Sequence, residues 1–284
     1  MNTPRPPEEA PHGILQREAA PTIHTGHAPT VLAERHGSVL QLSIDAPAAR
    51  NSLSTPGVLE GLLGGMERLD ADADLHCAII TGAGGSFSAG GDLRKLSQGS
   101  ESDVRHAMQR TAWLYRRIAM SDKLVIAAVD GPAFGAGLGL AICCDLVVAG
   151  PTARFCCAFV RVGAMPDAAL FWSLPARVGV AQARRLMLFA NEIDGAQAEA
   201  MGLADQYVAE GSALPAAQQL AQRLSHGPTR AYGRIKAGLR AAPMSVDAAL
   251  AFQLDNAPGL FASQDFREGA NAFFEKRKPV FQGR

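Results

Sequence analysis

The sequence predicts an α/β fold that is followed by an all-helical C-terminal region. Three observations support this prediction: short apolar runs typical of buried strands, longer segments between them with apolar residues at helical spacing, and only helical patterns after residue 208. The 284 residues are enough for one large domain with an appendage, and 48% hydrophobic residues are enough for a sizeable core.

The predicted core begins with a strand and a helix. Residues 39–44 form the strand, which ends at the turn sequence 45–47. Thr55-Pro56 caps and starts the helix, because proline is well tolerated in the first turn and apolar residues recur at helical spacing up to Leu69. The apolar run at 76–81 then predicts a buried strand.

The same alternation continues along the chain. Residues 103–120 predict a helix, residues 124–129 a second buried strand, and residues 146–148 a further strand after a glycine-rich segment. The side chains expected to face inward from this helix are Val104, Met108, Trp113, Leu114 and Ile118.

A change of pattern after residue 208 divides the chain. Helical patterns follow one another at 213–225, 229–240, 246–261 and 265–276. We therefore expect three regions: a flexible, proline-rich N-terminal extension over residues 1–30, a core over 31–210, and a helical assembly region over 211–284.

The charge balance argues against nucleic acid and membranes as partners. The chain has 27 Lys and Arg residues against 27 Asp and Glu residues, so it offers no electrostatic footprint for a polyanion. The longest uncharged apolar stretch, residues 131–144, is shorter than the roughly 20 residues that span a bilayer. The five cysteines show neither a disulfide pattern nor a metal-ligand spacing, so we expect no metal site and a reducing, cytoplasmic location.

Two glycine-rich segments follow predicted strands, and both can present backbone N–H groups. The first, residues 81–93, fits neither phosphate-binding template, because Phe87 stands at the third glycine position and no Gly-Lys-Ser/Thr occurs. The second, residues 130–140, leads into a helix, whose unpaired N–H groups and dipole favour a negative oxygen. Either segment alone is compatible with close packing through glycine. Two in succession provide the two convergent donors that an enolate or oxyanion requires.

These segments, in their order and spacing, resemble the crotonase superfamily, which is the enoyl-CoA hydratase/isomerase family. The matching pieces are residues 79–82 with 87–93, 126–131 leading to Gly135-Ala136-Gly137, 144–146, 163–179, 193–194 with 202–204, and 273–277. The resemblance implies a crotonase-like spiral of ββα units, an acyl-CoA thioester as the substrate, and a trimer or hexamer assembled through the C-terminal helices.

The same resemblance assigns the N–H groups of Gly91 and Ala136 to an oxyanion hole around the thioester carbonyl. Where the family usually has glycine, the methyl group of Ala136 restricts the backbone angles of that donor. The remaining assigned residues contact coenzyme A: Ala89, Asp92 and Leu93 with Ser52 and Leu53 opposite, and Phe273 and Lys276, which cover the CoA of a neighbouring subunit.

The catalytic side chains depart from the hydratase pattern. Hydratases of the family hold a water between two glutamates, and here those positions are Gly139 and Phe159. One carboxylate, Asp167, stands where isomerases of the superfamily carry a single acid, the ring-epoxide isomerases included. A dehalogenase is disfavoured, because its histidine position corresponds to Ala112. The alternative role for Asp167 is to cap a helix at 168–170.

Apolar neighbours are expected to raise the pKa of Asp167 toward that of a useful base, namely Phe159, Met165, Phe171 and Trp172. His106 and Arg110 are expected on a solvated helix face. Arg161 either contacts a carboxylate of the acyl group or pairs at the surface.

The favoured function is that of an enoyl-CoA isomerase of fatty acid metabolism, acting on a double bond or a ring. In the double-bond reaction, Asp167 takes a proton from C2 of a 3-enoyl thioester, the two N–H groups hold the enolate oxygen, and the proton returns at C4. These proton transfers need no metal or redox cofactor, and coenzyme A is part of the substrate. The alternatives are an enoyl-CoA hydratase with an atypical site and a catalytically weak protein of this fold that binds acyl-CoA or RNA.

Overall fold

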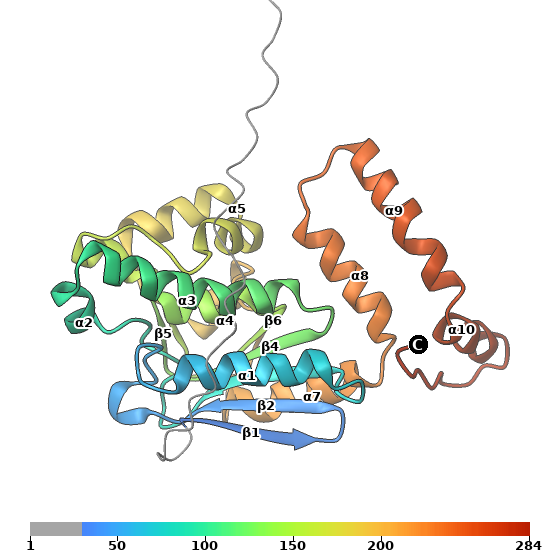
Figure 1. Cartoon of the computed structure of the whole chain (residues 1–284). Helices are drawn as coiled ribbons and strands as arrows, with labels where there is room; N and C mark the ends of the chain where they lie inside the picture. The colour runs from blue at the N-terminus through green and yellow to red at the C-terminus, as the bar shows by residue number, and fades with distance from the viewer. Residues whose placement is uncertain (1–29) are drawn as a thin grey trace, which may run out of the picture.

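A six-stranded sheet forms the centre of the molecule (Figure 1). The computed structural model describes residues 30–284, so the predicted N-terminal extension lies, except for its last residue, outside the described part. The strand order is β1-β2-β3-β4-β6-β9, with β1 antiparallel to β2 and all further pairs parallel. The strands are β1 (Val31–His36), β2 (Val39–Ile44), β3 (Cys77–Gly82), β4 (Leu124–Val129), β6 (Leu146–Ala149) and β9 (Gln206–Tyr207).

A second, three-stranded sheet lies against the first and has the order β5-β7-β8. Its short strands are β5 (Pro132–Phe134), β7 (Arg154–Cys156) and β8 (Ile193–Asp194). An isolated parallel bridge between Ser88 and Ala133 joins the segment after β3 to β5. This bridge positions the candidate site described below.

The central strands are buried on both faces, as their almost uninterrupted apolar sequences require. In β3, Ala78 and Ile80 face the larger core cluster, while Cys77 and Ile79 face a second cluster that includes Ala213, Ala217 and Ala221. These three alanines recur every fourth residue on α7 (Ala213–Ser225), so this helix lays one face on the sheet.

The core also contains the helices α1 (Val58–Ala71), α2 (Leu93–Gln98), α3 (Glu101–Met120), α4 (Ala136–Cys143), α5 (Leu170–Phe189) and α6 (Gly195–Ala200), and the 3-10 turns η1 (Pro47–Ala49) and η2 (Ala158–Val162). Of these, α1 packs on β1 and β2, α4 on β4 and β6, and α6 on β6 and β9. Helix α3 packs on both α1 and α4, and it forms one wall of the candidate site described below.

Three further helices project from the core on the right of Figure 1: α8 (Thr229–Arg240), α9 (Val246–Phe261) and α10 (Gln264–Phe274). Lys236 anchors α8, because its buried ammonium donates to the Ile118 carbonyl at 2.8 Å and to the Asp145 carboxylate at 2.8 Å. The α/β prediction and the helical C-terminal region are thus confirmed.

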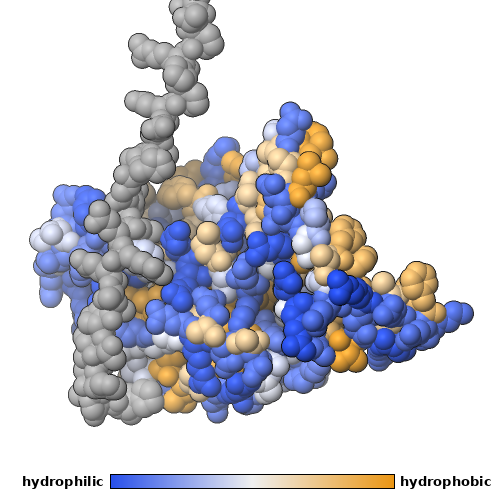
Figure 2. Space-filling model, turned by 45° about the vertical axis from the view of Figure 1, so that its right-hand side comes forward, coloured by the Kyte–Doolittle hydropathy of each residue, from blue (hydrophilic) through white to orange (hydrophobic). Residues whose placement is uncertain are grey.

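The C-terminal helices expose many apolar side chains. Figure 2 shows hydrophobic patches on the right of the view, where this region comes forward. Exposed apolar residues of α8 and α9 are Ile235, Leu239, Val246, Leu250, Leu254 and Phe261. Assembly into a trimer or hexamer through this region stays a prediction. None of the helices within residues 30–284 combines the length and apolarity of a bilayer span.

Some sequence-based bounds were wrong for local reasons. Thr55-Pro56 does not start a helix, because Gly57 has the left-handed φ of 85° and α1 begins only at Val58. Strand β1 was missed, since Val31 is its only buried residue and an edge strand of this kind shows no apolar alternation. The extent of helix α5 was not predicted beyond a possible start at 168–170, because Pro175 and the non-helical Gly179 interrupt its pattern.

Candidate active site

Two loops leave the same edge of the main sheet. Strands β3 and β4 are parallel neighbours with Thr81 opposite Ala128, so their following segments emerge side by side. The Ser88 N–H donates to the Pro132 carbonyl at 3.0 Å, and the Phe134 N–H donates to the Ser88 carbonyl at 3.0 Å. This short parallel ladder fixes the two loops to each other.

The ladder brings Gly91 and Ala136 together. A side-chain carbon added at Gly90 would lie 2.8 Å from the Ala136 nitrogen, so the backbones of the two loops are in direct contact there. Gly90 also has the left-handed φ of 82°, which glycine adopts without strain. Only glycine therefore suits position 90.

The Gly91 N–H is a free donor at the end of its loop. The N–H groups of its neighbours all have acceptors: Ser88 donates to Pro132, Ala89 to Arg50, Gly90 to the Ser88 hydroxyl, and Asp92 to the Ser54 hydroxyl. Gly91 donates to no acceptor among residues 30–284. Because backbone donors are nearly always paired when buried, this one is available to a ligand.

Ser52 and Leu53 orient that donor. The Ser52 hydroxyl donates to the Gly90 carbonyl at 2.8 Å, and the Leu53 N–H donates to the same oxygen at 2.9 Å. In a trans peptide the carbonyl and the following N–H point in opposite directions. Two bonds on the Gly90 carbonyl therefore aim the Gly91 N–H away from Ser52. Both side chains are nearly buried, which leaves their expected contact with CoA untested.

The second free donor is the first residue of α4. Gly135, with φ 53°, turns the chain into the helix, and Ala136 follows as its first helical residue. Ala136 is absent from the residues with positive φ, so its methyl group imposes no strain on the donor. The Ala136 N–H has no acceptor within the described chain, as expected for the first turn of a helix.

The residues expected at the CoA surface begin α2. The Asp92 carboxylate accepts from the Arg94 N–H at 2.9 Å and thus caps this helix. Leu93 is 57% exposed, and Ala89 is partly buried between the two loops. Asp92 therefore has a structural role in addition to any contact with a ligand.

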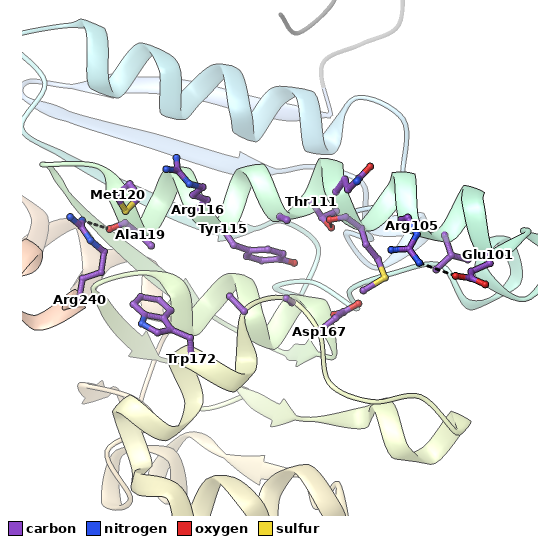
Figure 3. Close-up of a pocket in the computed structure, with 16 residues that line it drawn as sticks. Glu101, Arg105, Thr111, Tyr115, Arg116, Ala119, Met120, Asp167, Trp172 and Arg240 are labelled. Carbon is purple, nitrogen blue, oxygen red and sulfur yellow. Dashed lines mark hydrogen bonds and ion pairs between the residues drawn. The ribbon is translucent and has the colours of Figure 1, made fainter. Parts of the chain in front are cut away.

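A cavity of ≈ 690 Å³ lies between α3 and the start of α5 (Figure 3). Its lining is mostly apolar and includes Val104, Met108, Ala112, Tyr115, Met120 and Trp172. Two carboxylates face it. Glu101 is highly exposed and paired with Arg105 at 2.8 Å, whereas Asp167 is half-buried.

Asp167 carries an unpartnered buried oxygen. Its Oδ1 is shielded from solvent and accepts no hydrogen bond from the described residues. Burial raises the pKa of this carboxyl above its usual value, and its own backbone N–H opposes the rise. An unpaired, partly desolvated carboxylate at a cavity wall has the properties of a general base.

Tyr115 connects Asp167 to the free donor at Ala136. The buried Tyr115 hydroxyl donates to the Ala136 carbonyl at 3.1 Å and, in Figure 3, points toward Asp167. Burial raises the pKa of Tyr115, and the nearby Asp167 charge raises it further. Burial likewise raises the pKa of Cys157 to about 12, so both neighbours of Asp167 are neutral at pH 7.

The alternative role of Asp167 as a helix cap is wrong. Helix α5 begins at Leu170, and its N-cap residue is Ala169, without any side-chain cap. Ala168 and Ala169 both have left-handed backbones, with φ 54° and 59°, so the chain turns twice before the helix starts. This turn carries the Asp167 carboxylate into the cavity.

The two hydratase positions offer no carboxylate and little space. A side-chain carbon at Gly139 would lie 2.6 Å from the Ala168 carbonyl and in contact with the Ala168 methyl group. Phe159 packs against the core near Gly135. The structure thus closes the first of these positions with the same turn that carries Asp167.

Several other expectations are corrected by the packing. Met165 and Phe171 are 70% and 59% exposed, so of the expected neighbours only Trp172 lines the cavity. Arg161 pairs with Glu192 at 3.3 Å at the surface. Arg110 forms an ion pair with Glu60, in agreement with a solvated face.

Phe273 and Lys276 lie at the far end of the chain. Phe273 is 78% exposed, and neither residue lines the cavity of its own chain. Their contact with the CoA of a neighbouring subunit stays a prediction.

Tyr115 was not found from the sequence. The helical spacing indicated Trp113 as an inward residue, but the buried residues of α3 are Leu114, Tyr115 and Ile118. Trp113 and Tyr115 are two residues apart and therefore lie on different faces of the helix. Periodicity allows only one of them to face inward, and the larger apolar side chain, Trp113, was expected there.

The fold and site together define an α/β protein with two unpaired backbone donors on adjoining loops and a half-buried carboxylate at a cavity wall. The chain matches the family model described as enoyl-CoA hydratase/isomerase over residues 34–284. It therefore belongs to the enoyl-CoA hydratase/isomerase family, within the crotonase superfamily, as the sequence predicted.

Individual relatives have different activities. The chain is 34% identical to 1,2-epoxyphenylacetyl-CoA isomerase of Escherichia coli K12, over 89% of this chain and 98% of that one. It is also 34% identical to 2,3-dehydroadipyl-CoA hydratase of the same strain, over 89% and 99%. Among solved structures, an enoyl-CoA hydratase from Bacillus anthracis matches with a TM-score of 0.85 and 26% identity, over 90% of this chain and 100% of that one.

Proposed function

We propose that this protein is an enoyl-CoA isomerase that uses Asp167 as its single base. The observation that carries the proposal is the solvent-shielded Asp167 Oδ1, which has no hydrogen-bond partner among the described residues, while Ala168 closes the hydratase position Gly139. A hydratase must hold and activate a water, and this site has one buried carboxylate where that task uses two. A proton shift within the substrate needs only one.

The reaction follows from the placed groups. The thioester carbonyl accepts from the Gly91 and Ala136 N–H groups, and Asp167 takes a proton from C2 of a 3-enoyl-CoA. The electrons of the broken C–H bond form the enolate, whose oxygen the two donors stabilise. Asp167 returns the proton at C4 as the double bond moves to C2. Coenzyme A leaves unchanged on the product, and no metal or redox cofactor takes part.

A raised pKa suits this cycle. The base must accept a proton in one step and give it back in the next, so its proton affinity should lie between those of an ordinary carboxylate and the enolate. One relative is named 1,2-epoxyphenylacetyl-CoA isomerase, and we expect isomerisation of such a ring to need a single acid-base group as well. The double-bond shift is the reaction that we test first.

The test compares isomerisation of 3-hexenoyl-CoA with hydration of crotonyl-CoA, in the wild type and in Asp167→Asn. We expect isomerisation in the wild type, hydration that is slow or absent, and a loss of isomerisation of about 100-fold or more in the variant. Acyl-CoA affinity should change little, because amide and carboxylate have nearly the same shape.

The melting temperature provides the structural control. Asp167 caps no helix, so Asp167→Asn should unfold at the wild-type temperature or slightly above it. A variant that stays folded and binds acyl-CoA but isomerises at the wild-type rate would remove Asp167 from the mechanism. Crotonyl-CoA hydration faster than isomerisation in the wild type would favour the atypical hydratase instead.

A further inference from the structure

The cavity beside Asp167 ends at an arginine that has no acidic partner among residues 30–284. We propose that Arg240 of α8 selects acyl groups that carry a carboxylate at the end remote from the thioester. This inference rests on the proposed function for the place of the thioester, and it adds the class of acyl group that the site takes.

The cavity changes character along its length. Its wall between Asp167 and the far end includes Tyr115, Ala119 and Trp172 (Figure 3). In Figure 3 Trp172 lies between Asp167 and Arg240, with the guanidinium at the far end. A ligand that extends from Asp167 therefore crosses an apolar channel before it meets a charge.

The far end is positively charged. Arg240 lies there and forms no ion pair within the part of the chain that the structure describes. Arg116 also lines the cavity, but in Figure 3 its guanidinium points to the other side of α3. Arg116 contacts the Trp113 ring, with its guanidinium carbon 6.0 Å from the ring centroid. Of the two carboxylates that line the cavity, Glu101 is paired with Arg105. An anion from the substrate would supply the missing countercharge.

Arg240 also has a structural contact, and it leaves most of the guanidinium unused. One N–H donates to the Ala119 carbonyl at 3.0 Å, which is an unpaired group of the last turn of α3. A guanidinium has five N–H donors in a planar fork. The contact with Ala119 thus fixes the position of the fork, and the remaining donors can bind a carboxylate.

The geometry sets the length of the acyl group. Figure 3 places Asp167 opposite Thr111, and Arg240 bonds to Ala119, eight residues further along α3. At the helical rise this is about 12 Å. A suberoyl group, together with a carboxylate–guanidinium contact, reaches across such a span, whereas a succinyl group does not.

The experiment measures binding of saturated thioesters by calorimetry, so that no turnover is needed. The charged and neutral members of each pair have equal length: suberoyl-CoA with octanoyl-CoA, and succinyl-CoA with butyryl-CoA. In the wild type we expect suberoyl-CoA to bind about tenfold more tightly than octanoyl-CoA, within the range of a hydrogen bond to a charged group. The short pair should show no such preference.

Two variants of Arg240 and one control assign the effect. Arg240→Gln keeps a donor for the Ala119 carbonyl but removes the charge, so the preference should disappear while octanoyl-CoA binds as before. Arg240→Lys keeps a positive charge and should retain part of the preference. It therefore tests the role of the charge even if Arg240→Gln is misfolded. Arg234→Gln removes a charge from the same helix, where Arg234 pairs with Asp122 outside this cavity, and should retain all of it.

Three results would overturn the inference: equal affinities within the long pair, a preference that survives in Arg240→Gln, or an equal preference for succinyl-CoA. The outcome is separable from that of the proposed reaction. If 3-hexenoyl-CoA is not isomerised but suberoyl-CoA is preferred through Arg240, only the proposed reaction fails. If isomerisation occurs and the affinities are equal, only the assignment of Arg240 fails.

Discussion

Replacing Ser52 by alanine tests whether the Gly91 donor depends on its orientation. The substitution removes the 2.8 Å bond to the Gly90 carbonyl and the 3.2 Å bond that the Ser52 hydroxyl accepts from the Ser54 N–H. Among residues 30–284 it leaves the Leu53 N–H as the only donor to the Gly90 oxygen. Ser52 is 7% exposed, so a replacement water has little access. The variant keeps the fold but holds the Gly90–Gly91 peptide less firmly.

The magnitudes follow from the buried bond to the Gly90 carbonyl, since the bond from the Ser54 N–H is only part-buried. Its loss costs about 1 kcal/mol of stability, which corresponds to a fall of about 2–4 °C in the melting temperature of a chain of this size. If the same free energy is lost in holding the enolate oxygen, kcat for 3-hexenoyl-CoA falls about fivefold. KM should change less, because the oxygen carries more charge in the transition state than in the substrate.

Ser225→Ala is the matched control. The Ser225 hydroxyl is also buried and donates to a backbone carbonyl, that of Gln222 at 3.0 Å, at the end of α7. It should lower the melting temperature by a similar amount without changing kcat. An unchanged kcat in Ser52→Ala, at a lowered melting temperature, would refute the orienting role. A weaker affinity for free CoA alone would instead assign Ser52 to CoA binding.

Two further predictions concern the carboxylates. Gly139→Glu should lower the free energy of unfolding by about 1–3 kcal/mol, because the new side chain overpacks against Ala168, and it should not speed crotonyl-CoA hydration. The control is Gly64→Glu, which lies in open space on α1 and should leave thermal unfolding nearly unchanged. The pH profile of kcat/KM should rise as Asp167 loses its proton, with a midpoint above the ordinary value of about 3.9, and this limb should be absent from the residual rate of Asp167→Asn. Because the folded pKa is raised, the fold favours the protonated form. The wild type should therefore lose stability relative to Asp167→Asn as pH rises from the unfolded pKa through the folded one, as measured by urea unfolding.

The helices and strands with strong periodicity could be predicted from the sequence. Strand β4 and helices α7 and α8 have the bounds that the apolar spacing indicates, because each buries one face or both faces of a regular element. Helix α9 also has the predicted bounds, although its apolar side chains are exposed in this chain. The two-residue strands β8 and β9 could not be predicted, since their pairing depends on partners far along the chain. Local pattern is informative only where burial repeats along one element.

Only part of the candidate site could be predicted from the sequence. The glycine loops and Asp167 stand out as residue types, but the free N–H of Gly91 is defined by which neighbouring donors are already paired. Those partners, Arg50 and Ser54 among them, lie about 40 residues away along the chain. The orienting bond from Ser52, the buried hydroxyl of Tyr115 and the guanidinium of Arg240 likewise have no local signature.

The turn at Ala168 and Ala169 links the two features that distinguish this site. Left-handed backbone is unfavourable for alanine, so the sequence gives no sign of it and a helix cap at Asp167 is the natural expectation. In the structure this turn directs the Asp167 carboxylate into the cavity, and it also presses the Ala168 methyl and carbonyl groups against Gly139. A glutamate at 139 and the present position of Asp167 thus exclude each other sterically. A chain with this turn can therefore place one half-buried carboxylate, that of Asp167, between positions 139 and 167. This is the steric basis on which we propose a reaction that needs a single acid-base group.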